Sequence, residues 1–373
     1  MVLLFLGLVA LNVDRASGLT RLICFGDRFS STRLPDVVQS QPFVFARSDG
    51  YDGQFYAQIA TRPLLDDPEL ARALDSPDYR SRRIGLPWLA WLAGFGYTPW
   101  VLQAYALANV LVWLALAWML LRWIPPDRFT ARLAWFGAVF GVGSMMSVAR
   151  ALTDLPSALL IATAILLAER GRKRSAVVAL GFAALTRDTS VLAAGLLMST
   201  QRDGWREWMR GALSAALAIL PAALWGAYAH WRFPGSPQGD SANFSLPFVA
   251  MVGALGPLWR AVPQLGWHAF ATQALTTIAL CVQFLFLVLS ARRLWHTRWW
   301  RAGAAFALLF ALLGPAVWQE ATAAARVVLP MTLAFNILLP RDRRWSVAVC
   351  ALGNLSVLHG LAYLLPTTWT TLP

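Results

Sequence analysis

One short polar segment carries the residue types that could do chemistry in this chain. Asp49 and Asp52 stand three residues apart, each followed by a glycine, Gly50 and Gly53, with Tyr51 between them. Glycine lets a backbone turn sharply and approach a ligand. A carboxylate in such a turn can accept a proton from an attacking hydroxyl or hold a metal ion. Asp52 and Asp49 are therefore candidate catalytic residues; the alternative is an Asx-Gly turn that precedes an aromatic surface helix.

Aromatic and polar side chains surround these acids. Tyr51, Phe55 and Tyr56 offer flat faces that suit sugar rings. We take Tyr51, Gln54 and Tyr56 as candidate substrate-binding residues.

Three arginines follow about thirty residues later. Arg80, Arg82 and Arg83 could form a claw for phosphate or pyrophosphate, because a guanidinium group suits bidentate contact with phosphate oxygens. The alternative is anchoring at a membrane interface, or pairing with Asp75 and Asp78. The sequence leaves both interpretations open.

The rest of the chain is nearly continuous apolar helix. It has 373 residues, 58% hydrophobic and only 14% charged, whereas soluble domains carry about 25% charged residues. Runs such as Thr98–Leu121, Gly211–Trp231 and His268–Ser290 reach the ~20 apolar residues that cross a bilayer. We predict an all-α, polytopic membrane protein. The net charge of +13 is dispersed in short clusters between apolar runs, which excludes a nucleic-acid-binding stripe.

The basic clusters predict the orientation, because lysine and arginine are enriched in cytoplasmic loops. Residues 14–97 are then one long extracytoplasmic loop that carries juxtamembrane helices, such as Gly53–Thr61 and Pro68–Leu74, and residues 98–373 form the helical bundle of a single membrane domain, 1–373. The clusters expected in the cytoplasm are Arg122/Arg128/Arg132, Arg170/Arg172/Lys173/Arg174, Arg202/Arg206/Arg210, Arg292/Arg293/Arg298/Arg301 and Arg341/Arg343/Arg344. The turns expected outside are Arg150–Asp154, Arg187–Asp188, Arg232–Gly266 and Gln319–Arg326.

This reasoning gives about eleven membrane segments. The first is short for a span, and we favour a start codon placed too late as the explanation. Two others form a hairpin whose helices, about 18 Å long, are too short to cross a ~30 Å core. The predicted segments are Met1–Val13, Thr98–Leu121, Leu133–Ala149, Leu155–Ala168, Ser175–Thr186, Thr189–Thr200, Gly211–Trp231, His268–Ser290, Ala302–Trp318, Val327–Leu339 and Trp345–Leu365.

Six ionisable residues stand at the outward ends of these segments. Such charges are costly near lipid and tend to face a cavity or one another, so we expect a polar pocket beneath the long loop; the alternative for each is interfacial snorkelling. Oxygen ligands for Mg²⁺ or Mn²⁺ could come from Asp49, Asp52, Asp154 and Glu320, but sequence alone leaves the metal unknown. The six residues are Arg150, Asp154, Arg187, Asp188, Glu320 and Arg326.

Three motifs together resemble a known class of protein. They are Gly50-Tyr51-Asp52-Gly53-Gln54-Phe55-Tyr56, the run from Asp78 to Ile84, and Ala184-Leu185-Thr186-Arg187-Asp188-Thr189. The chain resembles bacterial polytopic proteins of cell-surface glycopolymer formation, which are similar to glycosyltransferases of the GT-C fold. The resemblance spans roughly Cys24 to Thr189; further on, only Glu320 and Arg326 match.

The resemblance implies a polyprenyl-phosphate sugar donor. It also implies a catalytic or metal-binding aspartate in the first extracytoplasmic loop, for which Asp52 is the first choice and Asp49 the second. Arg187 would contact the donor phosphate. A large soluble C-terminal domain has no counterpart here, so loops or a partner would recognise the acceptor.

The expected function is transfer of a sugar from a lipid-linked donor to a glycan or lipid acceptor of the cell envelope. The expected site faces outward from the bacterial inner membrane, with membrane lipid as a further partner and no nucleic acid. Two alternatives stay open: a transporter or flippase of lipid-linked glycans, which would also use buried charges and broken helices, and a non-catalytic scaffold of envelope assembly.

Overall fold

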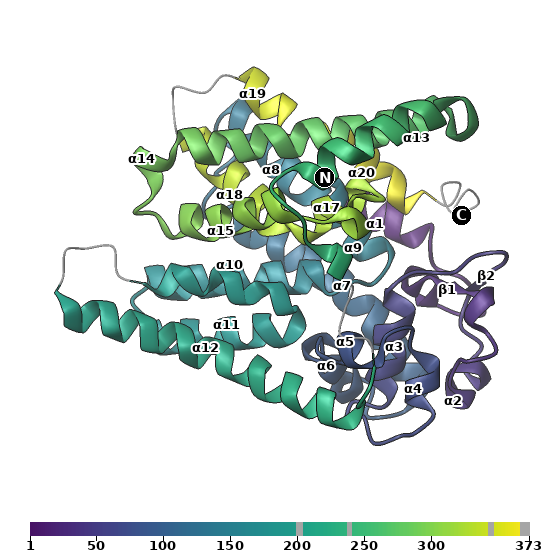
Figure 1. The fold of residues 1–373 in the computed structure, drawn as a ribbon. Helices are drawn as coiled ribbons and strands as arrows, with labels where there is room; N and C mark the ends of the chain where they lie inside the picture. The colour runs from purple at the N-terminus through teal and green to yellow at the C-terminus, as the bar shows by residue number, and fades with distance from the viewer. Residues whose placement is uncertain (199–203, 237–240, 342–346, 366–373) are drawn as a thin grey trace.

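The computed structural model describes residues 1–198, 204–236, 241–341 and 347–365, and these residues are mostly helical (Figure 1). The only strands in these ranges are β1 (Phe25–Gly26) and β2 (Val44–Phe45), which pair in parallel with Phe25 opposite Val44. The predicted all-α class is confirmed. Arg202, Arg343 and Arg344 of the predicted basic clusters lie outside the described residues.

Residues 14–97 fold into short helices joined by turns, and this region contains no long helix. Proline opens two of the helices, at the first helical position where its missing N–H costs nothing. The predicted helix Gly53–Thr61 is confirmed as α3, whose every residue is buried. The other elements of this region are η1 (Thr20–Ile23), η2 (Asp27–Phe29), α2 (Pro35–Gln39), α4 (Leu70–Ala73), α5 (Pro77–Ser81) and α6 (Gly85–Ala93).

Five helical stretches are long and apolar enough to cross a membrane, and a bent pair makes a sixth. They are α7 (Thr98–Leu120), α8 with α9 (Phe129–Phe140 and Val142–Ala149), α12 (Trp205–Arg232), residues Phe270–Leu289 of α13 (Val249–Leu289), and Val347–Leu364, which holds α19 (Val347–Leu352), α20 (Val357–Gly360) and η6 (Leu361–Leu364). The bent pair is α17 (Ala321–Val327) with α18 and η5 (Leu329–Leu338 and Leu339–Arg341), which meet at 69°.

The outer surface of α12 fits a lipid environment. Large apolar side chains such as Leu213 and Leu224, 61% and 62% exposed, cover it, and a soluble monomer rarely shows so extended an apolar face. A protein that spans a membrane several times accounts for these features.

The finer prediction of eleven segments stays a prediction. Several predicted spans correspond to helices shorter than the ~20 residues that a span needs, among them α1 (Val2–Ala10), α10 (Asp154–Glu169), α11 (Lys173–Thr186) and α15 (Arg298–Leu312). The predicted span Ala302–Trp318 is interrupted at Gly314, beyond which α16 (Pro315–Trp318) begins. The predicted turn Arg232–Gly266 is helical from Val249, where α13 starts. The first helix, α1, covers Val2–Ala10.

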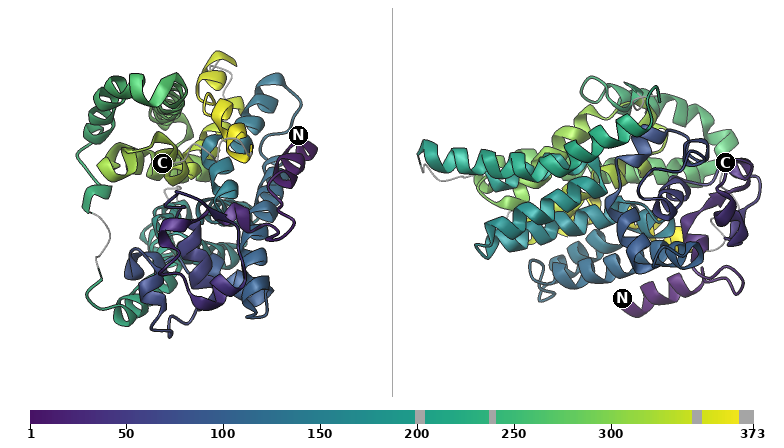
Figure 2. Two further views of the ribbon diagram at one scale, coloured as in Figure 1. Left: turned by 90° about the vertical axis from the view of Figure 1, so that its right-hand side faces the viewer. Right: turned by 90° about the horizontal axis from the view of Figure 1, so that it is seen from below.

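The helices form two groups, called stacks below: an upper stack that includes α13, α15, α17 and α18, and a lower stack of α10, α11 and α12 (Figure 1). In Figure 1, α13 runs along the upper edge and α12 along the lower edge, with α10 and α11 above α12. The elements of residues 14–97 gather at the right-hand end, and α14 (Ala291–Leu294), which carries Arg292 and Arg293, lies at the left-hand end. Figure 2 shows the same arrangement from two further sides.

The predicted hairpin breaks where the charges stand. Its first helix, α11, ends at Thr186, and Arg187 adopts an extended backbone with φ −150° and ψ 123°. The second arm differs from the prediction in kind: it is a 3-10 helix, η3 (Asp188–Leu197), and the predicted end at Thr200 lies outside the described residues. A 3-10 run of this length is uncommon. The break leaves the buried Arg187 side chain at the junction between the two stacks.

Candidate functional site

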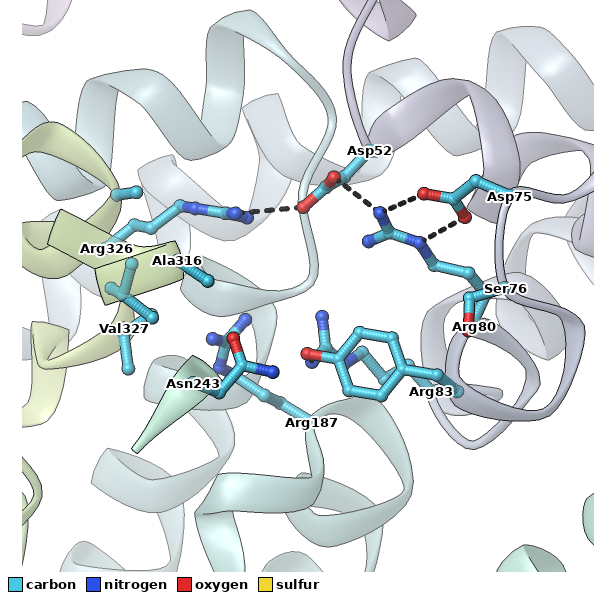
Figure 3. Close-up of a pocket in the computed structure, with 13 residues that line it drawn as sticks. Asp52, Asp75, Ser76, Arg80, Arg83, Arg187, Asn243, Ala316, Arg326 and Val327 are labelled. Atoms are coloured by element: carbon cyan, nitrogen blue, oxygen red, sulfur yellow. Dashed lines mark hydrogen bonds and ion pairs between the residues drawn. The ribbon is translucent and has the colours of Figure 1, made fainter. Parts of the chain in front are cut away.

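A cavity of about 550 Å³ lies where the region 14–97 meets both stacks (Figure 3). One wall is ionic and comes from the start of α3, from α5 with the turn after it, and from the α11–η3 break. The opposite wall is mostly apolar and comes from α16 and α17. The cavity is lined by Asp52, Asp75, Ser76, Tyr79, Arg80, Arg83, Arg187, Asn243, Ala316, Val317, Ala323, Arg326 and Val327.

The backbone before α3 is folded tightly so that Asp52 reaches this cavity. Gly50 has φ +69°, a left-handed conformation that glycine adopts without strain, and its Cα faces the amide of Gly26. Gln54 fixes the turn from inside: its Oε1 accepts from the Gly26 N–H at 3.1 Å, and its Nε2 donates to the Asp49 carbonyl oxygen at 2.7 Å. Gln54 therefore holds the loop and does not line the cavity, in contrast to its predicted substrate-binding role.

The Asp52 carboxylate lies between two guanidinium groups. Its Oδ1 is 2.9 Å from Arg80 Nη2, and its Oδ2 is 2.9 Å from Arg326 Nη2. Burial alone would raise the pKa of this carboxyl, but the charges of Arg80 and Arg326 outweigh burial and hold the pKa well below its usual range. Asp52 is ionised in this state and, while both arginines contact it, is a weak base.

Two of the three predicted claw arginines line the cavity. Arg80 forms a bidentate pair with Asp75, at 2.8 and 2.7 Å, in addition to its contact with Asp52. The Arg83 guanidinium contacts the hydroxyls of Tyr56 and Tyr79, each at 2.5 Å, and Asp188 at 3.3 Å. Both arginines are thus held in fixed orientations by neighbouring groups, of which Asp52, Asp75 and Tyr79 also line the cavity.

Arg82, the third arginine of the predicted claw, is outside the cavity lining. Its guanidinium turns away from the cavity lining and pairs with the fully buried Asp78 at 2.7 Å. The sequence-based alternative, pairing of these arginines with Asp75 and Asp78, is what Arg80 and Arg82 do, although Arg80 keeps a face on the cavity. Asp78 also lies 3.3 Å from Nδ1 of His230, on the last turn of α12.

The α11–η3 break brings a further guanidinium to the site. Arg187 Nη1 is 2.5 Å from Asp154 Oδ1, and Arg326 Nη1 is 3.6 Å from Asp154 Oδ2. Asp154 is at the start of α10 and is buried, so it balances these two arginines from behind. Asp52 and Arg187, which are far apart in the sequence, therefore line one cavity.

Other predicted residues lie beside the cavity or away from it. Tyr56 is fully buried and accepts hydrogen bonds from Arg80 and Arg83, which makes it a positioning residue. Tyr51 packs against the guanidinium of Arg150, 4.2 Å from ring centroid to Cζ, and against that of Arg326 at 5.2 Å.

Asp49 and Glu320 are also outside the lining. Asp49 is exposed and forms an ion pair with Arg28 at 2.9 Å. Glu320 accepts a hydrogen bond from the Thr322 hydroxyl at 3.2 Å. Asp49, the second-choice catalytic residue, is therefore not placed to meet a ligand in the cavity.

The apolar wall was missed by sequence reasoning. Ala323 and Val327 stand three residues before and one residue after Arg326, so a helix through 321–327 turns all three towards the same side. That spacing was the available signal, but small apolar residues on an apolar helix do not stand out. Tyr79 and Asn243 were missed as well.

The residues present do not suit a metal ion. Within the described ranges, no group of three or more histidine, cysteine, aspartate or glutamate side chains lies close enough to hold one. Each oxygen of Asp52 already faces an arginine, and Asp49 and Glu320 lie elsewhere. The four acids considered as ligands from sequence therefore do not form one site.

The lining has a formal charge of +2, because four arginines face two aspartates. Such a surface can bind an anion with several oxygen atoms, and the apolar wall opposite can accept a hydrocarbon group. No family model, curated protein or solved structure matches the chain.

Proposed function

We propose that this protein transfers a sugar from a lipid-linked phosphate donor to an acceptor hydroxyl. The observation that carries the proposal is a cavity that brings together four arginines, an apolar surface on α16 and α17, and the Asp52 carboxylate. A polyprenyl-phosphate sugar has the matching parts, namely an anionic phosphate, a hydrocarbon chain and a polar ring.

The phosphate would lie against Arg80, Arg83, Arg187 and Arg326. Guanidinium groups bind phosphate oxygens through paired N–H donors and keep their charge at any physiological pH. The first isoprene units would contact Ala316, Val317 and Val327 on the opposite wall. The sugar would then lie between the phosphate and the acceptor, next to Asp52.

Transfer then needs one displacement. The acceptor oxygen attacks the anomeric carbon, the bond from that carbon to the phosphate oxygen breaks, and the phosphate leaves with the electron pair. The proton of the acceptor hydroxyl passes to Asp52. The arginines stabilise the charge that develops on the departing phosphate. A single displacement inverts the configuration at the anomeric carbon.

The resting ion pairs add a control on this step. Donor phosphate and Asp52 compete for the guanidinium groups of Arg80 and Arg326. When the phosphate takes them, the pKa of the buried Asp52 rises, because burial is then less strongly opposed. Asp52 becomes a competent base only when the donor is bound, which couples deprotonation of the acceptor to the presence of the donor phosphate.

The wider proposal follows the resemblance to glycosyltransferases of the GT-C fold. It includes about eleven membrane segments, a location in a bacterial inner membrane and a site that opens on the extracytoplasmic face. The separation of the basic α14 from residues 14–97, at opposite ends of the molecule, supports this orientation (Figure 1). The acceptor is a glycan or lipid of the cell envelope.

A reconstitution experiment tests the proposal. Purified protein in liposomes is given a radiolabelled polyprenyl-phosphate sugar, with and without a membrane extract that supplies acceptors. We expect label to leave the lipid only when acceptor is present, with release of polyprenyl phosphate. Movement of intact donor between leaflets without cleavage would instead identify a transporter. If the donor is neither cleaved nor moved, the protein acts as a scaffold.

A further inference from the structure

A second hollow lies far from the candidate site. It has a volume of about 420 Å³ and lies between the α7–α8 connection and the end of η5. Three arginines line it: Arg122 and Arg128 from the connection, and Arg341 from η5. None of them has a role in the proposed transfer reaction.

The floor of this hollow is rigid. Trp123 is buried, and its Nε1 donates to Glu169 Oε2 at 3.0 Å. Its ring packs edge-on against Trp299, 5.1 Å between ring centroids. Arg341 Nη2 donates to the Trp123 carbonyl oxygen at 3.3 Å, which ties η5 to the connection. The three arginines therefore stand around a pre-formed surface.

The hollow is cationic. One carboxylate, that of Asp127, belongs to its lining and gives a formal charge of +2 beside the three guanidinium groups. Asp127 is a weak counter-charge, because its side chain is 62% exposed and 4.0 Å from Arg128 Nε. The surface is thus suited to an anion that presents several oxygen atoms.

Apolar side chains flank the hollow where the long helices end. Trp118, about one helical turn before Arg122, is 77% exposed, and Phe129, next to Arg128, is 66% exposed. The other end of α7 meets the region 14–97, where the Thr98 hydroxyl donates to Asp36. With 23 residues, α7 is about 35 Å long, so the hollow lies roughly one bilayer thickness from that region.

We propose that this hollow binds the phosphate headgroup of an anionic glycerophospholipid. The headgroup phosphate contacts the three arginines, and the acyl chains lie along Trp118 and Phe129. Basic pockets at the ends of membrane helices bind such headgroups by charge and hydrogen bonding. The bound lipid would fix the α7–α8 connection against η5. This inference does not depend on the proposed transferase activity.

Native mass spectrometry of the full chain tests the site. The protein, released from detergent micelles, is titrated with phosphatidylglycerol, with phosphatidylcholine as the neutral probe. A basic residue at a membrane surface changes affinity for anionic lipid by about fivefold. We therefore expect about fivefold weaker phosphatidylglycerol binding for Arg128→Gln, and about 100-fold weaker binding for the triple variant Arg122→Gln/Arg128→Gln/Arg341→Gln.

A second triple variant is the matched control. Arg170→Gln/Arg172→Gln/Arg174→Gln removes the same charge from exposed arginines outside the hollow, two in the α10–α11 connection and Arg174 in the first turn of α11. It should bind phosphatidylglycerol as the wild type does. Circular dichroism and the elution volume check folding, and Arg128→Gln, whose side chain is 61% exposed, decides the matter if the triple variant misfolds.

Three results would overturn the inference. One is an equal loss of phosphatidylglycerol binding in the control variant, which would indicate general surface charge. Another is binding of the neutral phosphatidylcholine as tightly as phosphatidylglycerol. The last is displacement of bound phosphatidylglycerol by millimolar inorganic phosphate, which would identify a site for the free anion and not for a lipid.

Discussion

Replacing Asp52 by asparagine separates the two tasks that the cavity combines. The amide keeps the size and shape of the carboxylate but loses its charge and its ability to take a proton at neutral pH. Asp52 contacts Arg80 and Arg326, each at 2.9 Å. The substitution therefore removes the proposed base and, at the same time, releases two guanidinium groups for a phosphate.

The expected magnitudes follow from these contacts. Loss of a general base slows a reaction by about 10²- to 10⁴-fold, so transfer by Asp52→Asn should fall by at least about 100-fold. Donor binding should tighten by about fivefold, because an internal competitor worth about 1 kcal/mol is removed. Breaking a buried ion pair costs about 3–5 kcal/mol, but Arg80 keeps Asp75 and Arg326 keeps Asp154. We expect a loss of stability of only about 1–3 kcal/mol.

The assay measures both quantities on the same preparation. Single-turnover transfer of labelled sugar gives the rate, and equilibrium binding of a polyprenyl phosphate gives the affinity. Asp49→Asn is the matched control, because Asp49 is exposed, pairs with Arg28 and lies outside the cavity. Transfer by Asp52→Asn within threefold of the wild type would refute the role of base, and weaker phosphate binding in a folded variant would refute the competition.

Three further perturbations probe the same cavity. Arg187→Gln should raise KM for the donor by about 10- to 100-fold with a smaller effect on kcat, in steady-state kinetics, because a charge-assisted contact to phosphate is lost; an unchanged KM would count against that contact. The pKa of Asp52 lies well below its usual range, so kcat/KM should stay flat from pH 7 to about pH 5. In Arg80→Gln the carboxylate loses a stabilising charge, so the fall of kcat/KM at acid pH should begin at a higher pH. A fall that begins at the same pH as in the wild type would contradict the pairing of Asp52 with Arg80. Gly53→Ala should lower the unfolding temperature by several degrees, because the added Cβ would collide with the Arg150 carbonyl oxygen; a stability equal to that of the wild type would show that the close approach is relieved easily.

Local sequence signals predicted the parts of the site that depend on short-range geometry. The glycines around Asp52 predicted the turn, and the amphipathic pattern of Gly53–Thr61 predicted the helix, because both signals act within one or two turns. The charge of Arg187 within an apolar run predicted a break at that residue. Burial of such a charge is tolerated only beside a partner, and Asp154 provides one.

Long-range packing decided the rest. Arg80 is on α5 and Arg82 directly follows its last residue, and their side chains diverge, so only the surrounding structure can determine which one reaches the cavity. Asp49 and Asp52 carry the same local signal, because both precede a glycine, and only the family resemblance ranked Asp52 first. They differ in their partners, because Asp49 pairs with the exposed Arg28 whereas Asp52 pairs with Arg80 and Arg326. A local sequence pattern does not predict contacts of this kind.

The number of spans depends on information of a different kind. Hydropathy identifies an apolar run, but Leu155–Ala168 and Ser175–Thr186 belong to helices of 16 and 14 residues. Whether helices of that length cross a bilayer depends on neighbours that shield their ends. Sequence and helix length therefore agree on a membrane protein and leave the count of segments to experiment.

The contact between Asp52 and Arg326 also has a consequence for biosynthesis. Roughly 270 residues separate these two side chains in the chain, and a ribosome that adds 5–20 residues per second needs roughly 15 to 55 s to make them. During that interval the newly made acidic turn has Arg80 but not its second cation. A nascent chain halted before α17 would therefore have an incomplete cavity. The cavity is completed only when the last helices are translated.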